Sequence, residues 1–246
     1  MASITETEPK PAAAGHPRRW LVLAVMSLGT LMVFLDNTVV NTALPAISTD
    51  LGASISELQW VVDAYTLVLA GLLLLGGSLG DRFGRKRWMI VGLGIFGIGA
   101  VGSALADSIT SLIIARGVQG LGAALVLPAT LSIITAVFPR GERAKAIGVW
   151  SGIGALGIGI GPALGGYLVD DFGWSSVFWL HLPVIAIAYL GMLVVPNRRT
   201  SGYASWIFQV RFLARPVWPP SSSVSSVQAS SAGSLASRSW PFRQLQ

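Results

Sequence analysis

The fold is indicated first by Gly76–Arg87, GGSLGDRFGRKR, a charged, glycine-rich stretch between two long apolar segments. One acid, Asp81, is followed by four bases within six residues. We interpret the stretch as a tight turn. A basic turn between apolar segments is typical of a cytoplasmic hairpin in a membrane protein, because loops rich in Lys and Arg stay on the cytoplasmic side.

The composition favours a membrane protein and excludes several other classes. Of the 246 residues, 52% are hydrophobic and 11% are charged, whereas about 25% are charged in soluble domains. The net charge is +6, but the bases form short clusters between apolar segments, so we predict no nucleic-acid partner. The chain has no Cys and 2 His. We therefore predict no metal site and no enzymatic activity.

Six segments are long and apolar enough to cross a bilayer, which takes roughly 20 residues per helix. They cover residues 20–47, 58–80, 88–106, 109–138, 144–169 and 177–195. The predicted fold is all-α and integral to the membrane. It has an N-terminal arm at residues 1–19, a six-helix domain at 20–199 and a Ser-rich tail at 200–246.

Charges alternate from one connection to the next. Bases occupy the arm and every even connection: Lys10, Arg18 and Arg19; Arg82, Arg85, Lys86 and Arg87; Arg140, Arg143 and Lys145; and Arg198 and Arg199 after the sixth span. The odd connections carry only acids: Asp50 and Glu57, Asp107, and Asp170 and Asp171. The positive-inside rule predicts a multi-pass protein of the plasma (inner) membrane with its N-terminus and tail in the cytoplasm.

An internal echo links the two halves of this domain. GGSLGDRFG at Gly76–Gly84 shares the frame G-G-x-L-x-D-x-F-G with GGYLVDDFG at Gly165–Gly173. Leu-Pro-Ala recurs at residues 44–46 and 127–129. Either the two matches are chance similarity between helix ends, or spans one to three are an inverted copy of spans four to six, as in many secondary transporters.

Four motifs resemble the major facilitator superfamily, and within it the branch of fourteen-helix drug:proton antiporters. They are LDNTVVNTALP (Leu35–Pro45), GSLGDRFGRKR (Gly77–Arg87), LIIARGVQGLGAA (Leu112–Ala124) and GIGIGPALGG (Gly157–Gly166). The resemblance covers residues 20–196. It implies the N-terminal six-helix half of a major facilitator fold, built as a 3+3 inverted repeat. Relatives usually have a Trp-Arg pair and then an Asn before a Pro after the fifth span. This chain instead has Trp174-Ser175 and His181, so no role is assigned there.

Two charges lie deep inside predicted spans. Asp36 is ~14 Å below the outer end of span one, and Arg116 is ~12 Å below that of span four, at a rise of 1.5 Å per residue. We expect both to face one central cavity, with protonation of Asp36 coupled to substrate movement and Gln119 orienting Arg116. The alternative is a structural ion pair that locks two helices. Asn37 and Asn41 share a helical face and either contact substrate or join helices.

Two further groups are candidates. The antiporter motif consists of Gly157, Gly161, Pro162, Gly165 and Gly166, and the resemblance implies that it seals the cavity; its glycine spacing also suits plain helix packing. The latch group consists of Gly77, Asp81, Arg82, Gly84 and Arg85, and the resemblance implies that it holds two transporter halves together. From the residues alone we predict a turn permitted by glycines, with the two arginines at a helix C-terminus.

The tail has no acid and no apolar run long enough to span a bilayer. Residues 203–215 read as a basic amphipathic helix on the membrane surface, and the remainder as disordered. We expect a frameshift or premature stop after the first half of a longer carrier; the alternative is a natural short protein that dimerises.

The expected function is proton-driven efflux of hydrophobic, often cationic drugs by alternating access, powered by the proton gradient without a cofactor. The expected partners are the lipid bilayer, a small-molecule substrate and either the missing C-terminal half or a second copy. The alternatives are an exporter of an endogenous metabolite and a non-transporting fragment.

Overall fold

The computed structural model describes residues 16–193 and residue 195, and the description below concerns these residues. The tail, with its predicted surface helix at residues 203–215, lies outside the described residues, as does most of the N-terminal arm. The helices are α1 (Arg19–Leu51), α2 (Ile55–Phe83), α3 (Arg85–Ala104), α4 (Ile109–Val137), a short 3₁₀ turn η1 (Arg140–Glu142), α5 (Arg143–Phe172), α6 (Ser176–Trp179) and α7 (His181–Gly191).

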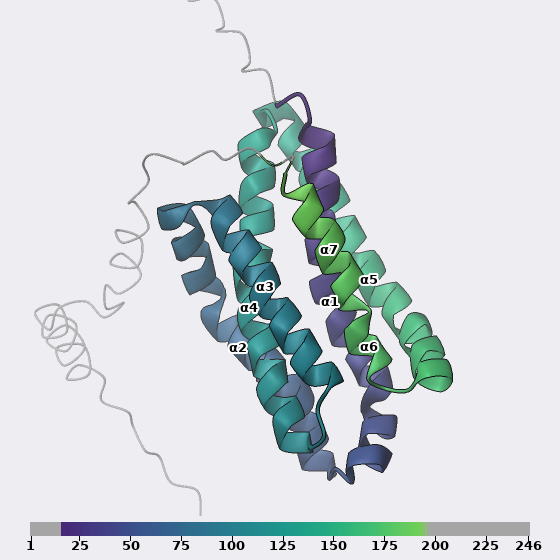
Figure 1. The fold of residues 1–246 in the computed structure, drawn as a ribbon. Coiled ribbons are helices and arrows are strands. Elements are labelled where there is room, and N and C mark those ends of the chain that lie inside the picture. The colour runs from purple at the N-terminus through teal and green to yellow at the C-terminus, as the bar shows by residue number, and fades with distance from the viewer. Residues whose placement is uncertain (1–15, 194, 196–246) are drawn as a thin grey trace, which may run out of the picture. The chain divides into compact units, whose positions relative to one another are not determined.

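The long helices run side by side in one elongated bundle (Figure 1). The most extensive packing joins α4 to α3 and α2, and α1 to α5. The two most buried helices, α1 and α4, also contact each other along the middle of the bundle. A bundle of this kind buries each apolar helix against small residues of its neighbours, which is how helices associate within a bilayer.

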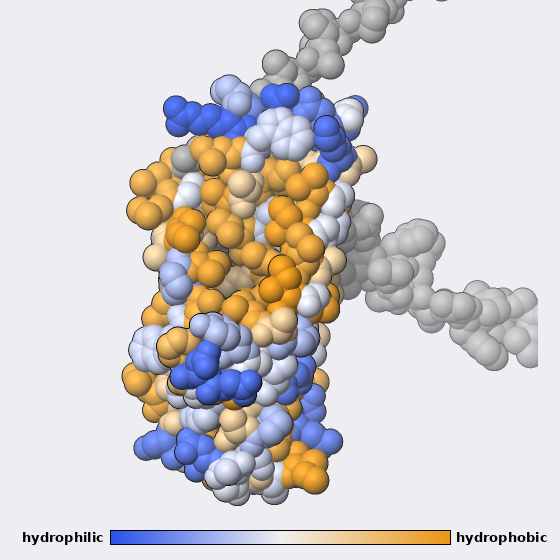
Figure 2. All heavy atoms as spheres, turned by 90° about the vertical axis from the view of Figure 1, so that its right-hand side faces the viewer, coloured by the Kyte–Doolittle hydropathy of each residue, from blue (hydrophilic) through white to orange (hydrophobic). Residues whose placement is uncertain are grey.

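The surface has the pattern of a membrane-embedded protein. Five helices of the described part of the chain are long and apolar enough to cross a bilayer. A broad apolar band lies between two hydrophilic ends on the face shown in Figure 2. On α5 the exposed apolar side chains include those of Leu156, Ile158 and Ile160. Exposed apolar side chains of this density match lipid or another membrane protein rather than water.

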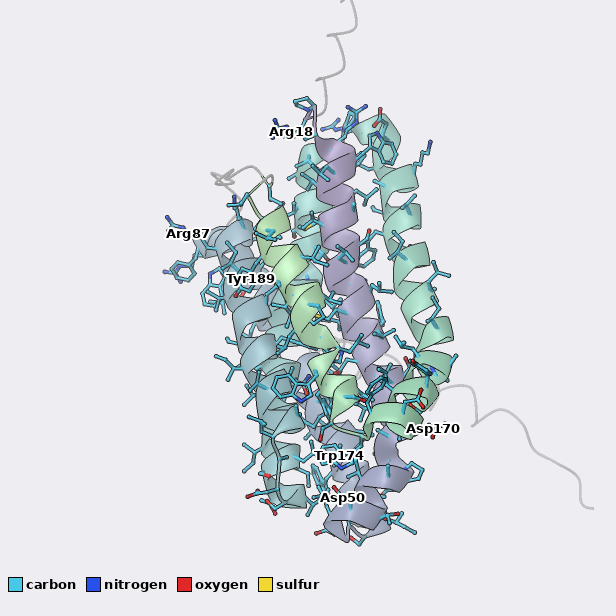
Figure 3. The ribbon with its side chains drawn as sticks, turned by 45° about the vertical axis from the view of Figure 1, so that its right-hand side comes forward. Arg18, Asp50, Arg87, Asp170, Trp174 and Tyr189 are labelled. Atoms are coloured by element: carbon cyan, nitrogen blue, oxygen red, sulfur yellow. The ribbon has the colours of Figure 1, made fainter. Side chains whose placement is uncertain are left out.

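The charged connections sort to opposite ends of the bundle. Arg18 and Arg87 lie at one end, and Asp50 and Asp170 lie at the other (Figure 3). At the basic end, Arg19 donates to both carboxylate oxygens of Glu142, at 2.7 and 3.1 Å. This ion pair joins the start of α1 to the turn before α5. The alternation of charge along the sequence thus becomes a separation of charge along the bundle axis.

The sixth predicted span is shorter than expected and is interrupted. The sixth span, predicted over residues 177–195, is present as one short apolar helix over Ser176–Gly191, with a local interruption at Leu180, since α6 ends at Trp179 and α7 begins at His181. Pro183 explains the interruption, since it has no N–H to donate to the Trp179 carbonyl and its ring crowds that carbonyl.

The prediction that Gly76–Arg87 forms a tight turn is wrong in its extent. Helix α2 continues to Phe83, α3 begins at Arg85, and only Gly84 lies between them. Gly84 has φ +106°, and its N–H donates to the Gly80 carbonyl at 3.0 Å. Gly80 is helical and buried, so it does not make the turn. Gly84 alone reverses the direction of the chain, in a backbone conformation that glycine adopts readily.

We therefore predict that Gly84→Ala destabilises this hairpin by about 1–3 kcal/mol, because a Cβ is strained at this φ whatever the space around it. Thermal unfolding of the purified chain in detergent measures the effect. The matched control is Gly77→Ala in α2, where an added Cβ meets only the Pro128 side chain at 3.7 Å. Equal melting temperatures for the two variants would contradict the prediction.

The packing agrees with an inverted repeat. Exchanging α1 with α4 and α2 with α5 maps the α1–α5 contact onto the α4–α2 contact, and both are extensive. The echoed glycines Gly84 and Gly173 both end a long helix with positive φ, +106° and +79°. Pro45 and Pro128 both lie inside the repeat-related helices. The two echoes thus occupy equivalent places in the fold.

Candidate functional site

A buried ion pair joins α1 to α4 near the middle of the bundle. Arg116 Nη1 donates to Asp36 Oδ2 at 2.7 Å, and both side chains are 0% exposed. The two residues, which the sequence places at comparable depth in their helices, therefore contact each other directly. Removing two charges from water is costly unless they are well paired and hydrogen bonded; surrounding residues bond to both charges, while Arg116 Nη2 has no hydrogen-bond partner among the described residues.

Gln119 orients the pair, one turn along α4 from Arg116. Its Nε2 donates to Asp36 Oδ1 at 3.2 Å, and its Oε1 accepts from Arg116 Nη1 at 3.0 Å. The same Oε1 accepts from Ser103 Oγ on α3, also at 3.0 Å. Two donors thus face the amide oxygen while the amide nitrogen faces the carboxylate. Gln119 fixes the relative position of the two charges and ties them to a third helix.

Helix α2 holds the guanidinium from the other side. Arg116 Nε donates to the Val61 carbonyl at 3.1 Å, and its Cζ lies 4.4 Å from the ring centroid of Tyr65. Tyr65 is itself anchored, because its hydroxyl donates to the Val33 carbonyl on α1 at 3.1 Å. A desolvated cation over an aromatic face gains about 2 kcal/mol. Sequence reasoning did not find Tyr65, since an aromatic in an apolar span carries no distinctive signal.

His181, at the start of α7, is the fourth polar member of this cluster. It is 0% exposed, and its Nε2 lies 3.4 Å from Asp36 Oδ1. Its Nδ1 lies 3.2 Å from the Phe178 carbonyl. The sequence signal was present, because this is the one histidine inside an apolar segment. His181, however, lies outside the four motifs, and the sequence alone does not place α7 against α1.

The expectation that Asp36 and Arg116 face a central cavity is wrong for this conformation. Both side chains are 0% exposed. The hollow at the acidic end is lined by residues such as Asp50, Phe172 and Trp174 and does not include either charge. Position along a helix predicts how deep the two charges lie, whereas their burial depends on the neighbouring helices.

The two asparagines lie on the partly open side of α1. Asn41 is exposed, and its Nδ2 donates to the Asn37 carbonyl at 2.8 Å. Asn37 is half-buried. They share a helical face, as predicted, but they do not belong to the Asp36 cluster. Among the described residues neither side chain donates a hydrogen bond to another helix, and both substrate contact and the joining of helices stay predictions.

The glycine motif of α5 packs against α1 along one face. Gly157, Gly161 and Gly165 are buried, and a Cβ at Gly161 or Gly165 would overlap the hydroxyl of Thr38 or Thr42, respectively. Pro162 is exposed, and Gly166 is half-buried with open space around its Cα. The motif therefore has one packing face and one outward face. The implied sealing of a cavity stays a prediction.

The latch group forms contacts inside the described unit. Arg85 donates to Asp81 Oδ1 at 2.9 Å and to the Ser132 carbonyl of α4 at 2.7 Å. Arg85 is the first residue of α3, and its guanidinium reaches back to Asp81 in the last turn of α2, so it lies near that helix C-terminus. Arg82 does lie in the last turn of α2 and is exposed. Gly77 packs beside Pro128. A latch between two halves stays a prediction.

The profile of the Major Facilitator Superfamily matches residues 26–233, which is most of the chain. The chain belongs to this superfamily. Its place there agrees with the four motifs and with the six-helix architecture. The match continues past the domain boundary predicted at residue 199 into residues outside the described part of the chain.

Curated relatives of this superfamily member are drug- and antibiotic-resistance proteins, which agrees with the drug-efflux branch indicated by the motifs. The chain is 44% identical over 168 residues to the multidrug resistance protein Stp of Mycobacterium tuberculosis, covering 68% of this chain and 31% of Stp. It is 42% identical over 203 residues to the puromycin resistance protein of Streptomyces alboniger, covering 82% of this chain and 40% of that protein. It is 36% identical over 203 residues to the tetracenomycin C resistance and export protein of Streptomyces glaucescens, covering 79% and 38%.

Solved transporter structures share the fold of this superfamily member. The proton:xylose symporter XylE superposes with a TM-score of 0.65 at 19% identity, covering 73% of this chain and 45% of XylE. A bacterial homologue of the lysosomal transporter Spinster superposes with a TM-score of 0.61 at 24% identity, covering 78% and 47%. The chain thus spans less than half the length of each of these relatives. It is a multi-pass membrane protein of a transporter superfamily rather than of an enzyme family.

Proposed function

We propose that this superfamily member acts in proton-driven efflux of small hydrophobic molecules, often cationic, by alternating access. The observation that carries the proposal is the buried pair of Asp36 and Arg116, held by Gln119 between repeat-related helices. Ionisable residues inside a membrane are costly and are usually retained for transport. Relatives whose names refer to resistance to puromycin and methyl viologen support this class of substrate.

The proton gradient is the proposed energy source, with no cofactor. Protonation of Asp36 removes its attraction for Arg116 and weakens the contact between α1 and α4. Because the pair is closed to water in this conformation, protons reach it in a second conformation, in which these helices admit water. A purely structural role for the pair is less well supported, because apolar residues of similar volume often pack as stably as a buried ion pair.

Transport also requires a partner that covers the outer faces of α2 and α5. These are the least buried of the long described helices. Their exposed faces carry polar groups such as Asp63 and Ser151 beside the apolar ones, and polar groups are disfavoured against lipid. The proposed partner is a second membrane domain, either a C-terminal six-helix half or a second copy. The proposed orientation has the basic end in the cytoplasm, by the positive-inside rule.

Substitution of Asp36 tests the proposal. Purified chain is reconstituted in liposomes with an acidic lumen, and uptake of ethidium, a fluorescent organic cation, is followed. We expect the pH gradient to drive accumulation in the wild type, and Asp36→Asn to reduce it roughly tenfold or more, because Asn binds no proton at this position. Asn keeps an oxygen that accepts from Arg116, so the packing is retained.

The matched control is Asp171→Asn, which removes an exposed carboxylate at the acidic end of α5, outside the cluster; it should transport as the wild type does. Unchanged gradient dependence in Asp36→Asn would leave the pair with a structural role only. Absence of ethidium uptake by the wild-type chain would instead favour a fragment that does not transport by itself, and co-expression with a C-terminal half from a relative then tests the need for a partner.

A further inference from the structure

Asp36 and His181 present two hydrogen-bond acceptors to each other in a site without water contact. His181 Nδ1 lies 3.2 Å from the Phe178 carbonyl oxygen, which only accepts, so Nδ1 carries a hydrogen when this contact is a bond. In a neutral imidazole the other nitrogen then has a bare lone pair. That nitrogen, Nε2, lies 3.4 Å from Asp36 Oδ1 and has no hydrogen-bond partner among the described residues.

The opposite tautomer does not remove the conflict. A hydrogen on Nε2 satisfies Asp36, but Nδ1 then turns its lone pair toward the Phe178 carbonyl. The two acceptors on either side of the ring are satisfied together only when one further proton enters the site.

Arg116 opposes permanent occupancy by this proton. Its guanidinium is 2.7 Å from the same carboxylate and already balances its charge, so an added proton gives the cluster a net charge of +1. A buried uncompensated charge costs several kcal/mol, and a buried unpaired acceptor costs about 1–3 kcal/mol. These two costs oppose each other, as a proton that is both taken up and released requires.

Among the residues that the structure describes, the remaining neighbours of the cluster add no further charge. From α2, Tyr65 lies against Arg116, and from α3 the Phe96 ring lies 5.4 Å from the imidazole centroid. The charged residues of α5 are confined to its two ends, at Arg143 and Lys145 and at Asp170 and Asp171. Helix α7 carries no further ionisable side chain before Tyr189. Proton binding here is therefore decided by Asp36, Arg116 and His181.

We propose that Asp36 and His181 together form a proton-binding site, in which one exchangeable proton is held between Asp36 Oδ1 and His181 Nε2. Uptake forms one O–H or N–H bond and adds one positive charge, and release returns the proton to water. Its part in coupling rests on the proposed function. This site links α1 to α7 when the proton is bound and leaves the two helices unbonded at this point when it is absent.

Nitrogen NMR of the histidines tests the proton-binding site. The chain has 2 His, so purified protein labelled with ¹⁵N-histidine in phospholipid nanodiscs gives two imidazoles, and a His16→Gln variant assigns His181. We expect Nδ1 to be protonated at every pH and Nε2 to gain a proton on acidification. Asp36→Asn should lower the proton affinity of His181 about tenfold or more, since an adjacent carboxylate is lost. Asp63→Asn is the matched control and should leave it unchanged.

Infrared absorption of the Asp36 carboxyl provides a second measurement, in which the tested variant is His181→Asn and Asp36→Asn serves only to assign the band. His181→Asn should shift the pH at which the carboxyl band changes, and Asp36→Asn in the same background identifies that band. The site is contradicted if His181 titrates identically with and without the Asp36 carboxylate. It is also contradicted if the pH at which the Asp36 band changes is the same in His181→Asn as in the wild type.

Neither measurement requires transport, so one proposal can be contradicted while the other stands. Gradient-driven ethidium uptake together with a His181 titration independent of Asp36 overturns the proton-binding site and leaves the proposed function standing. An Asp36-linked His181 titration in a chain that moves no ethidium supports the site and contradicts only transport by this chain.

Discussion

Arg116→Met should destabilise the bundle by about 3–5 kcal/mol, because it leaves the Asp36 carboxylate buried without a compensating charge. It also removes the hydrogen bond to the Val61 carbonyl and the cation over Tyr65. The free energy of unfolding, measured by reversible denaturation in mixed micelles, reports the loss. Arg116→Lys should recover only part of it, since an ammonium lacks the planar fork that reaches Val61 and Asp36 together.

The double variant Asp36→Asn/Arg116→Met separates lost pairing from lost packing. With no charge left in the cluster, we expect most of the stability to return. The matched control is Arg82→Met, the same substitution at an exposed position in α2, which should change stability by no more than about 0.5 kcal/mol. A double variant no more stable than Arg116→Met alone would show that the carboxylate is not the source of the cost.

Gly120→Ala should separate α2 from α4 and cost about 3 kcal/mol, the upper range for overpacking a dense core. A Cβ at this position would overlap the Tyr65 carbonyl oxygen and would lie 3.1 Å from the Tyr65 Cα. These are backbone atoms, so no side-chain rotation relieves the clash. Tyr65 also supports Arg116, so the substitution disturbs the ion pair as well.

The matched control for Gly120→Ala lies one turn earlier on the same helix. At Gly117 an added Cβ meets only Val68 Cγ2, at 4.0 Å. Gly117→Ala should be neutral or stabilise by about 0.5–1 kcal/mol, because Ala is favoured over Gly within a helix. Thermal unfolding ranks the variants. Because the chain has no Cys, spin labels at introduced Thr66→Cys and Ile114→Cys report the α2–α4 separation directly. Equal separation and stability in both variants would contradict the argument.

The membrane class and the positions of the helices were predictable from local sequence. Hydropathy over about 20 residues reports whether a segment crosses a bilayer. The predicted start of span four at Ile109 coincides with the start of α4. The start of span two was placed at Leu58, three residues after α2 begins, because the Ser54–Glu57 capping box was not recognised. The echoed glycines also predicted that Gly84 and Gly173 occupy equivalent helix ends.

The predictions from sequence are wrong where the conformation of a segment depends on a neighbouring helix. Gly76–Arg87 contains enough glycine to suggest a long turn, but Gly76 is needed for close packing, since its Cβ would overlap the Ala124 carbonyl. Glycine at a helix crossing and glycine in a turn look alike in sequence. Likewise, Pro183 interrupts the sixth span although Pro45, Pro128 and Pro162 lie inside continuous helices.

The sequence by itself determined that the chain crosses a membrane, which connections share one end of the bundle, and at what depth Asp36 and Arg116 lie. These follow from hydrophobicity, charge and the rise of a helix, all of which are properties of one segment at a time. Only the tertiary structure decided that the two charges are sealed away from water, that Tyr65 lies under the guanidinium, and that His181 adjoins the carboxylate. Those facts depend on how each helix is rotated about its axis, and that rotation is set by which small residues let neighbouring helices approach.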